Sequence, residues 1–183
     1  FETFSLSSDK IQFKMNIEFK ISKKPINYKK ALRFLEKRVN LVKNGGRELV
    51  WLLEHPITFT AGIRSSDHEI LDKSINVIKT NRGGKITLHN PGQKVVYFAI
   101  NLNKRKKNIR NLVKQIENII IEFLKLYKIN SKADRKNIGI WFKNKKIAAI
   151  GVRVSRWVAY HGFSININND LNEYKKIIPC GLD

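Results

Sequence analysis

The sequence predicts an α+β fold in which a mixed, mainly antiparallel sheet is flanked by helices. Apolar and polar residues alternate along several short segments, as in half-buried strands. Two longer segments repeat apolar residues every three or four positions, as amphipathic helices do. The strand and helix patterns do not alternate regularly along the chain, which favours α+β over α/β.

The N-terminal part is predicted to form a strand, a helix and a second strand. Apolar residues alternate with polar ones from Ile11 to Ile21, which is typical of a half-buried strand. After Pro25, four apolar residues recur at helical spacing: Leu32, Leu35, Val39 and Val42. Gly45-Gly46 then ends the helix, and Glu48–Leu53 follows as a strand.

The remaining part contains one more helix and four more strands. The helix covers Ile109 to Tyr127, with a broad apolar face. The strands are predicted at Val95–Leu102, Ile138–Phe142, Lys146–Val154 and Val158–Ile167. The chain contains no internal repeat and no low-complexity linker, so we expect one domain over residues 1–183. Residues 1–14 precede the only methionine and are interpreted as a possible extension.

The net charge of +21 fits a nucleic acid, an anionic membrane surface or an acidic protein partner. The lysines are spread along the whole chain, and the densest cluster, KRKK at 104–107, is interpreted as a solvated loop. No zinc-finger, RNA-recognition or P-loop pattern is present. We therefore expect no nucleic acid as a partner, although charge alone does not decide this.

Cys180 is the only cysteine and lies between Pro179 and Gly181. A single cysteine excludes an intramolecular disulfide, and the four histidines show no metal-ligand spacing with it, so we expect no metal and a reducing cytoplasm. The apolar runs are too short to span a membrane. A thiol is a strong nucleophile as its thiolate, which a nearby ammonium stabilises. If the fold brings Lys146 to Cys180, the two form a reaction centre.

The segment from Arg82 to Gln93 is predicted to be a binding loop. It has paired glycines, where the backbone can approach a ligand closely, and His89 just before a Pro-Gly turn. Taken singly, the glycines are a turn and the histidine satisfies backbone groups, and Arg82 pairs with a carboxylate as readily as it contacts a substrate. The loop around Gly62-Ile63-Arg64, after His55-Pro56, has a weaker claim to the same cleft.

Four separated motifs resemble those of the lipoyl(octanoyl) transferases. They are EHP at 54–56, RGG followed by H-x-PGQ at 82–93, KIAAIGVRVSRWVAYHGFSIN at 146–166, and PCG at 179–181. Their order matches the family, and the resemblance covers residues 17–182. These enzymes transfer an octanoyl group from acyl carrier protein to a lysine of lipoyl domains, on a fold shared with lipoate and biotin ligases.

The resemblance implies roles for particular residues. Cys180 would carry the acyl thioester, and Lys146 would lower the pKa of its thiol. Substrate contacts would come from Arg82, Gly83, Gly84, Lys85, Ile86, Thr87, Leu88 and His89, from Ala149, Ile150 and Gly151, and from Gly162, Phe163 and Ser164. The acceptors would be lipoyl domains of 2-oxoacid dehydrogenase E2 subunits and the glycine cleavage H protein. Thioester exchange requires no cofactor. A monomer is the default expectation.

The sequence departs from the family pattern at three places. Leu88 replaces a usual aromatic residue, Asn90 replaces a usual glycine, and the chain ends at Asp183, so a C-terminal segment is expected to be missing. Two other functions stay open. An ATP-dependent lipoate or biotin protein ligase would share the fold without needing the cysteine, and a basic, non-enzymatic nucleic-acid-binding module would use the charge.

Overall fold

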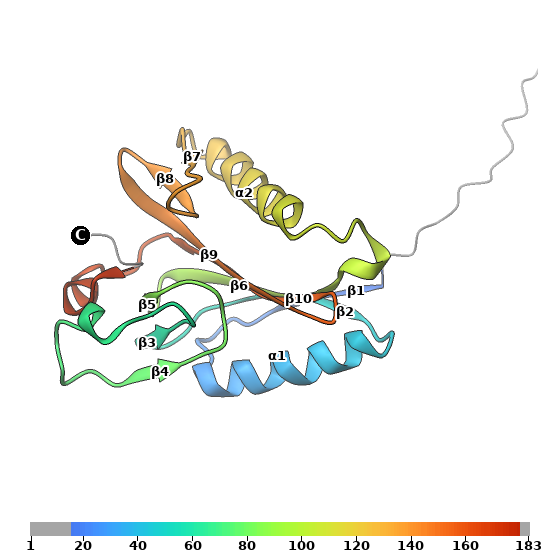
Figure 1. Cartoon of the computed structure of the whole chain (residues 1–183). Coiled ribbons are helices and arrows are strands. Elements are labelled where there is room, and N and C mark those ends of the chain that lie inside the picture. Colours follow the sequence, from blue (N-terminus) through green and yellow to red (C-terminus); the bar gives the residue numbers. More distant parts are fainter. Residues whose placement is uncertain (1–15, 180–183) are drawn as a thin grey trace, which may run out of the picture.

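The computed structural model describes residues 16–179, which form two sheets and two long helices (Figure 1). The large sheet has seven strands in the order β1-β2-β6-β10-β9-β8-β7. Only the β1–β2 pair in it is parallel, and its other pairs are antiparallel. The small sheet has the order β4-β3-β5. The predicted α+β class, with a mixed and mainly antiparallel sheet, is confirmed.

The strands of the large sheet are β1 (Ile17–Ile21), β2 (Glu48–Leu53), β6 (Gln93–Asn101), β7 (Lys132–Ala133), β8 (Ile140–Phe142), β9 (Lys145–Ser155) and β10 (Val158–Asn166). Those of the small sheet are β3 (Thr58–Ala61), β4 (Val77–Lys79) and β5 (Ile86–His89). The long helices are α1 (Tyr28–Lys43) and α2 (Ile109–Leu126), and short 3₁₀ turns are η1 (Asp67–Glu69), η2 (Leu102–Lys104) and η3 (Asn172–Lys176). No helix among residues 16–179 is long and apolar enough to cross a bilayer.

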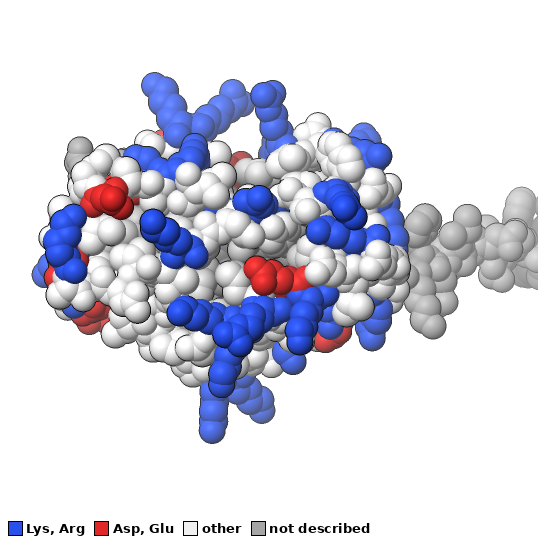
Figure 2. Space-filling view, turned by 60° about the horizontal axis from the view of Figure 1, so that its bottom comes forward, with Lys and Arg blue, Asp and Glu red and all other residues white. Residues whose placement is uncertain are grey.

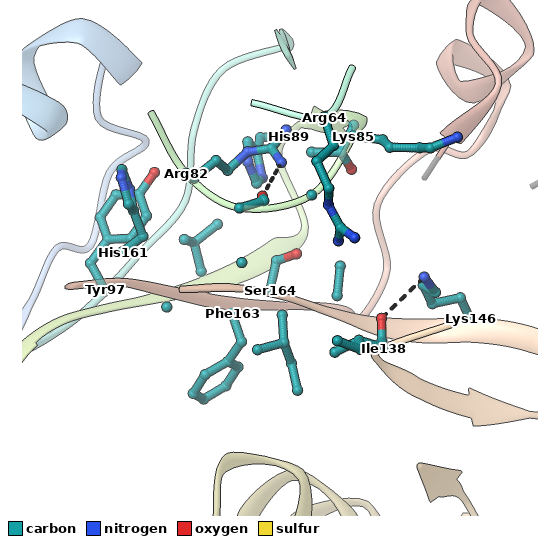
Figure 3. Close-up of a pocket in the computed structure, with 18 of the residues that line it drawn as sticks. Arg64, Arg82, Lys85, His89, Tyr97, Ile138, Lys146, His161, Phe163 and Ser164 are labelled. Atoms are coloured by element: carbon teal, nitrogen blue, oxygen red, sulfur yellow. Dashed lines mark hydrogen bonds between the residues drawn. The ribbon is translucent and has the colours of Figure 1, made fainter. Parts of the chain in front are cut away.

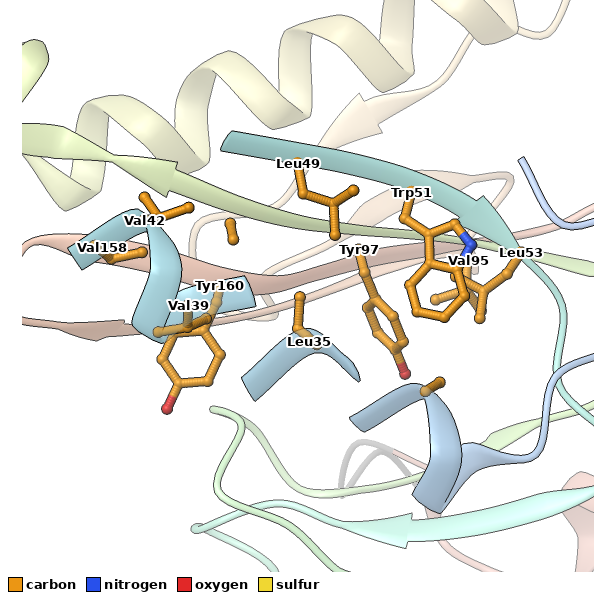
Figure 4. Close-up of a cluster of buried hydrophobic side chains, with 12 residues drawn as sticks. Leu35, Val39, Val42, Leu49, Trp51, Leu53, Val95, Tyr97, Val158 and Tyr160 are labelled. Carbon is orange, nitrogen blue, oxygen red and sulfur yellow. The ribbon is translucent and has the colours of Figure 1, made fainter. Parts of the chain in front are cut away.

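The two helices cover opposite faces of the large sheet (Figure 1). The apolar stripe of α1 packs against β2, β6 and β10, and its buried members in Figure 4 include Leu35, Val39 and Val42. The stripe of α2 packs on the other face, against residues of β6, β8, β9 and β10. Burial of these two faces, at about 25 cal/mol per Å² of apolar surface, is the main force that holds the layers together.

Strand β1 exposes the residues that its alternation predicts to be buried. Phe19 and Ile21 are 71% and 72% exposed. The polar residues that alternate with them face α1 instead. Glu18 forms an ion pair of 2.6 Å with Arg38, and the Lys20 ammonium lies over the Phe34 ring. The predicted strand is confirmed from Ile17 onwards, but the prediction of its buried face is wrong, because β1 is an edge strand that α2 does not cover. Residues 11–15 lie outside the described part.

The prediction of a loop from Arg82 to Gln93 is wrong in its second half, because Ile86–His89 is β5 of the small sheet. Ile86 and Leu88 are fully buried in a third apolar cluster with Phe59 and Ile177. Strand alternation therefore sends their side chains away from those of Thr87 and His89. The neighbouring strands β3 and β4 were not predicted from the sequence, because three or four residues carry little periodic signal.

Strand β10 contains a backbone irregularity at His161-Gly162. His161 has a φ of 65° and Gly162 a φ of 156°, and both lie in the region that side chains disfavour. A Cβ on Gly162 would lie 1.8 Å from the Val96 carbonyl oxygen of the neighbouring strand. Gly162 is therefore required where β10 pairs with β6.

Replacement of Gly162 by alanine is expected to destabilise the fold by more than about 3 kcal/mol, because backbone must move and a positive φ is strained. Its register partner Gly151 is the matched control, since a Cβ there meets its nearest atom at an ordinary 3.4 Å. Urea unfolding of Gly162→Ala and Gly151→Ala checks this. Equal free energies of unfolding for the two variants would contradict it.

Candidate active site

A cavity of about 280 Å³, here called the main cavity, lies between the β9–β10 part of the large sheet and the segment Arg82–Lys85 (Figure 3). Most of the residues singled out from the sequence line it, although they come from three separate stretches. They are Arg82, Gly83, Gly84, Lys85, Thr87, His89, Lys146, Ala149, Ile150, Gly151, Gly162, Phe163 and Ser164. The fold thus brings the separated motifs around one space.

Some predicted substrate residues present no side chain to the main cavity. Ile86 and Leu88 do not line it, because they belong to the small-sheet core described above. Ile150 and Phe163 line it, but their side chains pack with the α2 core, and Figure 3 shows the Phe163 ring on the far side of the sheet. Because Leu88 is buried elsewhere, its departure from the family pattern does not alter the cavity wall.

Close backbone contacts hold the Arg82–Lys85 segment over the sheet. Ile63 N–H donates to the Arg82 carbonyl at 3.1 Å, and Arg64 N–H donates to the Gly84 carbonyl at 3.1 Å. A Cβ on Gly62 would lie 2.4 Å from the Gly84 oxygen, so only glycine permits this approach. The loop 62–64 therefore positions the segment. The Arg64 side chain itself lines the cavity, in agreement with the prediction that this loop belongs to the same cleft.

The Arg82 guanidinium is buried and anchors the segment from within. Its Nη2 donates to the Thr60 carbonyl at 2.8 Å and to the Thr60 hydroxyl at 2.9 Å, and its Nη1 donates to the Gly83 carbonyl at 3.0 Å. Hydrogen bonds to a charged group are among the stronger ones in proteins. Arg82 thus lines the cavity and fixes the loop, but through these carbonyl and hydroxyl groups of the described residues and not through the carboxylate that the sequence suggested as its partner.

His89 is a neutral imidazole in the cavity wall. Its Nδ1 lies 2.6 Å from Gln93 Oε1, and the Gln93 amide nitrogen donates to Asn166 and Tyr174. The amide oxygen can only accept, so His89 Nδ1 carries the proton and Nε2 keeps its lone pair. Burial, with a smaller effect from neighbouring His55 and Arg82, lowers the pKa of His89 to about 3.

His55 supports the cavity from behind. The Ile26 carbonyl oxygen lies 2.7 Å from His55 Nδ1, so that nitrogen donates. His55 Nε2 then accepts from the Tyr97 hydroxyl at 2.9 Å, and Tyr97 lines the cavity. Burial also lowers the pKa of His55. The EHP motif therefore orients a cavity tyrosine rather than contacting the cavity space.

Lys146 is the second residue of β9 and lies at the opposite end of the main cavity from His161 (Figure 3). Its Nζ donates to the Ile138 carbonyl at 3.3 Å and lies 5.1 Å from the centre of the Trp141 ring. Lys146 also lines a second hollow of about 410 Å³, here called the side cavity, together with Trp141, Tyr174 and Pro179. Cys180, the predicted nucleophile, lies outside the described residues.

The sequence did not single out several residues that line the main cavity. Tyr28 opens α1, Tyr97 lies on β6, and Lys136, Asn137 and Ile138 come from the turn before β8. Only the three-dimensional pairing of strands reveals these neighbours. Among residues 16–179, no group of three or more His, Cys, Asp or Glu side chains could hold a metal ion.

Residues 27–183 match the family model of the lipoyl protein ligase A/B catalytic domain. An octanoyltransferase of Wolbachia sp. subsp. Brugia malayi is 42% identical over 172 residues, covering 91% of this chain and 84% of that protein. One of Ehrlichia chaffeensis is 44% identical over 173 residues, covering 91% and 81%. The chain belongs to the lipoyl protein ligase A/B family.

Solved structures agree on the fold of this family. A lipoate-protein ligase A bound with ATP has a TM-score of 0.73 at 13% identity, covering 87% of this chain and 70% of that one. A bipartite lipoate protein ligase from Thermoplasma acidophilum has a TM-score of 0.72 at 13% identity, covering 89% and 66%. The predicted likeness to the lipoate protein ligase fold is confirmed.

The neutral buried histidines of this family member predict an acid-sensitive fold. Burial also lowers the pKa of His161 to about 3, so an unfolded chain binds more protons than the folded one between about pH 6.5 and pH 3. Stability should therefore fall as the pH falls through this window. Between about pH 7 and pH 5.5 we expect a loss of about 1 kcal/mol for each of His89 and His161.

Urea unfolding at these two pH values checks the effect, since most carboxylates stay ionised there. His89→Gln should lose less stability than the wild type over the same interval. His68→Gln, on the exposed η1 turn, is the control and should behave as the wild type. A wild-type free energy of unfolding that does not change between the two pH values would contradict the neutral buried imidazoles.

Proposed function

We propose that this chain is an octanoyltransferase that moves an octanoyl group from acyl carrier protein to a specific lysine of lipoyl domains, through a thioester on Cys180. One observation carries the proposal. Segments 82–85, 149–151 and 162–164, which hold most of the residues of the resemblance, surround one cavity with Lys146 at its open end. Relatives with more than 40% identity are octanoyltransferases, which supports the same reaction.

The position of Pro179 supports a pairing of Cys180 with Lys146. Pro179, which is bonded to Cys180, lines the side cavity, and so does Lys146. Main and side cavities share Thr87, Lys146, Ala149 and Ser164. A sulfur near this junction would meet an acyl chain from one cavity and a carrier arm from the other. The Lys146 ammonium would stabilise the thiolate that attacks.

The first half-reaction exchanges one thioester for another. The Cys180 thiolate attacks the acyl carbonyl, the bond to the carrier sulfur breaks, and Lys146 passes its proton to the departing thiolate. The products are acyl-enzyme, carrier thiol and neutral Lys146. The energies of the two thioesters nearly balance, so the step requires no ATP, metal or other cofactor.

The second half-reaction forms an amide. A surface lysine has a pKa of about 10.4 and arrives as an ammonium, so it must lose a proton before it can attack. Neutral Lys146 takes that proton. The amine attacks the thioester carbonyl, a second proton leaves to solvent, and the carbon–sulfur bond breaks to restore the thiolate and the Lys146 ammonium.

An ATP-dependent lipoate or biotin ligase is the nearer alternative, because the structural neighbours include ligases. Their identity of 13% supports only the fold. The identity above 40% to octanoyltransferases favours acyl transfer. Dependence of product formation on ATP separates the two, since a ligase activates a free acid and a transferase uses an acyl thioester.

Proposed partners are octanoyl-acyl carrier protein as donor and, as acceptors, lipoyl domains of 2-oxoacid dehydrogenase E2 subunits and the glycine cleavage H protein. The ligase from Thermoplasma acidophilum is described together with its E2 lipoyl domain. Figure 2 shows Lys and Arg side chains at many points of one face and few acidic ones, which suits acidic protein partners. We infer a cytoplasmic monomer with one domain across residues 1–183, and no membrane or nucleic acid as partner.

Intact-protein mass spectrometry after incubation with octanoyl carrier protein tests the thioester. The wild type should gain one octanoyl group that hydroxylamine removes, while Cys180→Ser should gain no group labile in this way, because an oxygen ester resists mild hydroxylamine. The reaction should proceed without ATP. Equal amounts of hydroxylamine-labile label on the two proteins would exclude Cys180 as the acyl carrier.

Lys146→Ala should slow both half-reactions by about 10²–10⁴-fold, the usual size of a general acid–base effect, without unfolding the chain. Lys132→Ala removes the same charge from exposed strand β7, which lines neither cavity, and should keep both rates within a few-fold. Single-turnover acylation and deacylation rates measure the difference. Unchanged rates in Lys146→Ala, or equal losses in the two variants, would remove Lys146 from the mechanism.

A further inference from the structure

The main cavity has a buried end and an exposed end. At the buried end lie His161, Tyr97 and Tyr28, which are 2%, 5% and 2% exposed. At the other end lies Ile138, 45% exposed, beside exposed Lys136 and Asn137. Figure 3 shows His161 and Tyr97 at one side, Lys146 and Ile138 at the other, and Ser164 between them. A chain entering near Lys146 would therefore point its tip at His161.

His161 faces the main cavity only because the backbone of β10 is distorted. Ala159 and Phe163 pack on the α2 side, and regular alternation would send the residue between them to that side as well. The positive φ of His161 turns its ring to the opposite side of the sheet. There the centre of the imidazole lies 4.8 Å from the centre of the Tyr160 ring, on which it stacks, and 6.5 Å from the centre of the Tyr97 ring. Gly162 makes the distortion possible.

Local contacts hold the imidazole in this place. His161 Nε2 lies 2.7 Å from the Asn81 amide oxygen and therefore donates its proton there. Its Nδ1 is buried and has no hydrogen-bond partner among the described residues. A strained backbone and an unsatisfied buried nitrogen are both costly, and such costs concentrate at functional sites.

The depth of the main cavity matches a medium-length chain. Ser164 pairs with Ala149, and His161 pairs with Val152. The positions opposite Ser164 and His161 are therefore three residues apart along β9. At about 3.3 Å per residue, this separation is roughly 10 Å. Extended chains advance about 1.2 Å per bond, so eight carbons span roughly 8 to 9 Å. An acyl group held near Ser164 would end against His161.

We propose that His161 is the end stop of the acyl site and that Gly151, beside it, keeps the passage open, so that these two residues set the accepted chain length. The proposal rests on the proposed acyl transfer for its substrate class. It assigns a specificity role to His161, whose ring closes the cavity, and explains why the strained His161-Gly162 step is present in β10.

Two substitutions should shift chain length in opposite directions. His161→Asn shortens the side chain at a positive φ that Asn tolerates, and this leaves room for a longer acyl tip. Gly151→Ala adds one methyl group toward the Gly83 oxygen and Arg82 Cδ, at 3.4 and 3.5 Å, and this shortens the space without backbone strain. Val39→Ala is the control, because Val39 lies in the α1 core and lines neither cavity.

Binding of free hexanoate, octanoate, decanoate and dodecanoate, measured by calorimetry, tests the proposal directly. A buried methylene is worth about a fourfold gain in affinity, so two are worth about 15-fold. Wild-type affinity should rise from hexanoate to octanoate and not beyond. The ratio of decanoate to octanoate affinity should rise about 15-fold in His161→Asn, and the ratio of octanoate to hexanoate affinity should fall by the same factor in Gly151→Ala. Val39→Ala should keep the wild-type ratios.

Three results would overturn the end stop: no fatty acid bound by the wild type, affinity still rising through dodecanoate, or His161→Asn weakening all chain lengths equally. Thermal unfolding by circular dichroism verifies that each variant is folded. A parallel transfer assay with acyl carrier protein donors of the same lengths separates the two proposals. If fatty acids bind as expected but no donor acylates the wild type, the proposed function fails and the end stop stands.

Discussion

The close approach of the Arg82–Lys85 backbone to the 62–64 loop and to the large sheet is the constraint on which the rest of the site depends. Gly62 allows the Gly84 carbonyl to pass where any side chain would collide, and the Arg82 guanidinium holds Thr60 and Gly83 together beneath it. This bridge between the two sheets encloses the main cavity. Without it, β9 and β10 would present a flat, open surface to solvent.

The buried part of the site combines neutral imidazoles with one anchored guanidinium, that of Arg82, and further cations lie toward the opening. The imidazoles of His89 and His161 have a pKa of about 3 and are uncharged at neutral pH, so the inner wall offers lone pairs and apolar edges to a fatty chain. Arg64, Lys136 and Lys146 gather toward the exposed end, where thioester and amine chemistry requires charge. Burial thus separates chain binding from proton transfer within one fold.

Periodicity predicted the elements that carry a long amphipathic signal. Helices α1 and α2 and strands β2, β6, β9 and β10 begin and end within a few residues of their predicted bounds. The small sheet was missed because the Gly83-Gly84 and Pro91-Gly92 turn signals frame β5, and because β3 and β4 are short. The prediction of the buried face of β1 was wrong because β1 lies at the sheet edge, outside the core that α2 covers. Local alternation does not encode which element covers a strand.

Much of the candidate site followed from motifs, and the remainder required tertiary pairing. The register of β9 with β10 places Gly151 opposite Gly162, which sequence spacing alone does not reveal. Tyr28 and Tyr97 reach the cavity from α1 and β6, and no local pattern distinguishes them from core aromatics. The positive φ of His161 is a property of its neighbours, so its turn toward the cavity was equally hidden.

A crystal structure of the octanoylated protein would show where the acyl chain lies. We expect continuous density from the Cys180 sulfur, past Lys146 and between the Gly83-Gly84 segment and the β9–β10 strands, with the terminal methyl group against the His161 ring. An acyl chain lying outside the main cavity, or attached to a residue other than Cys180, would contradict it.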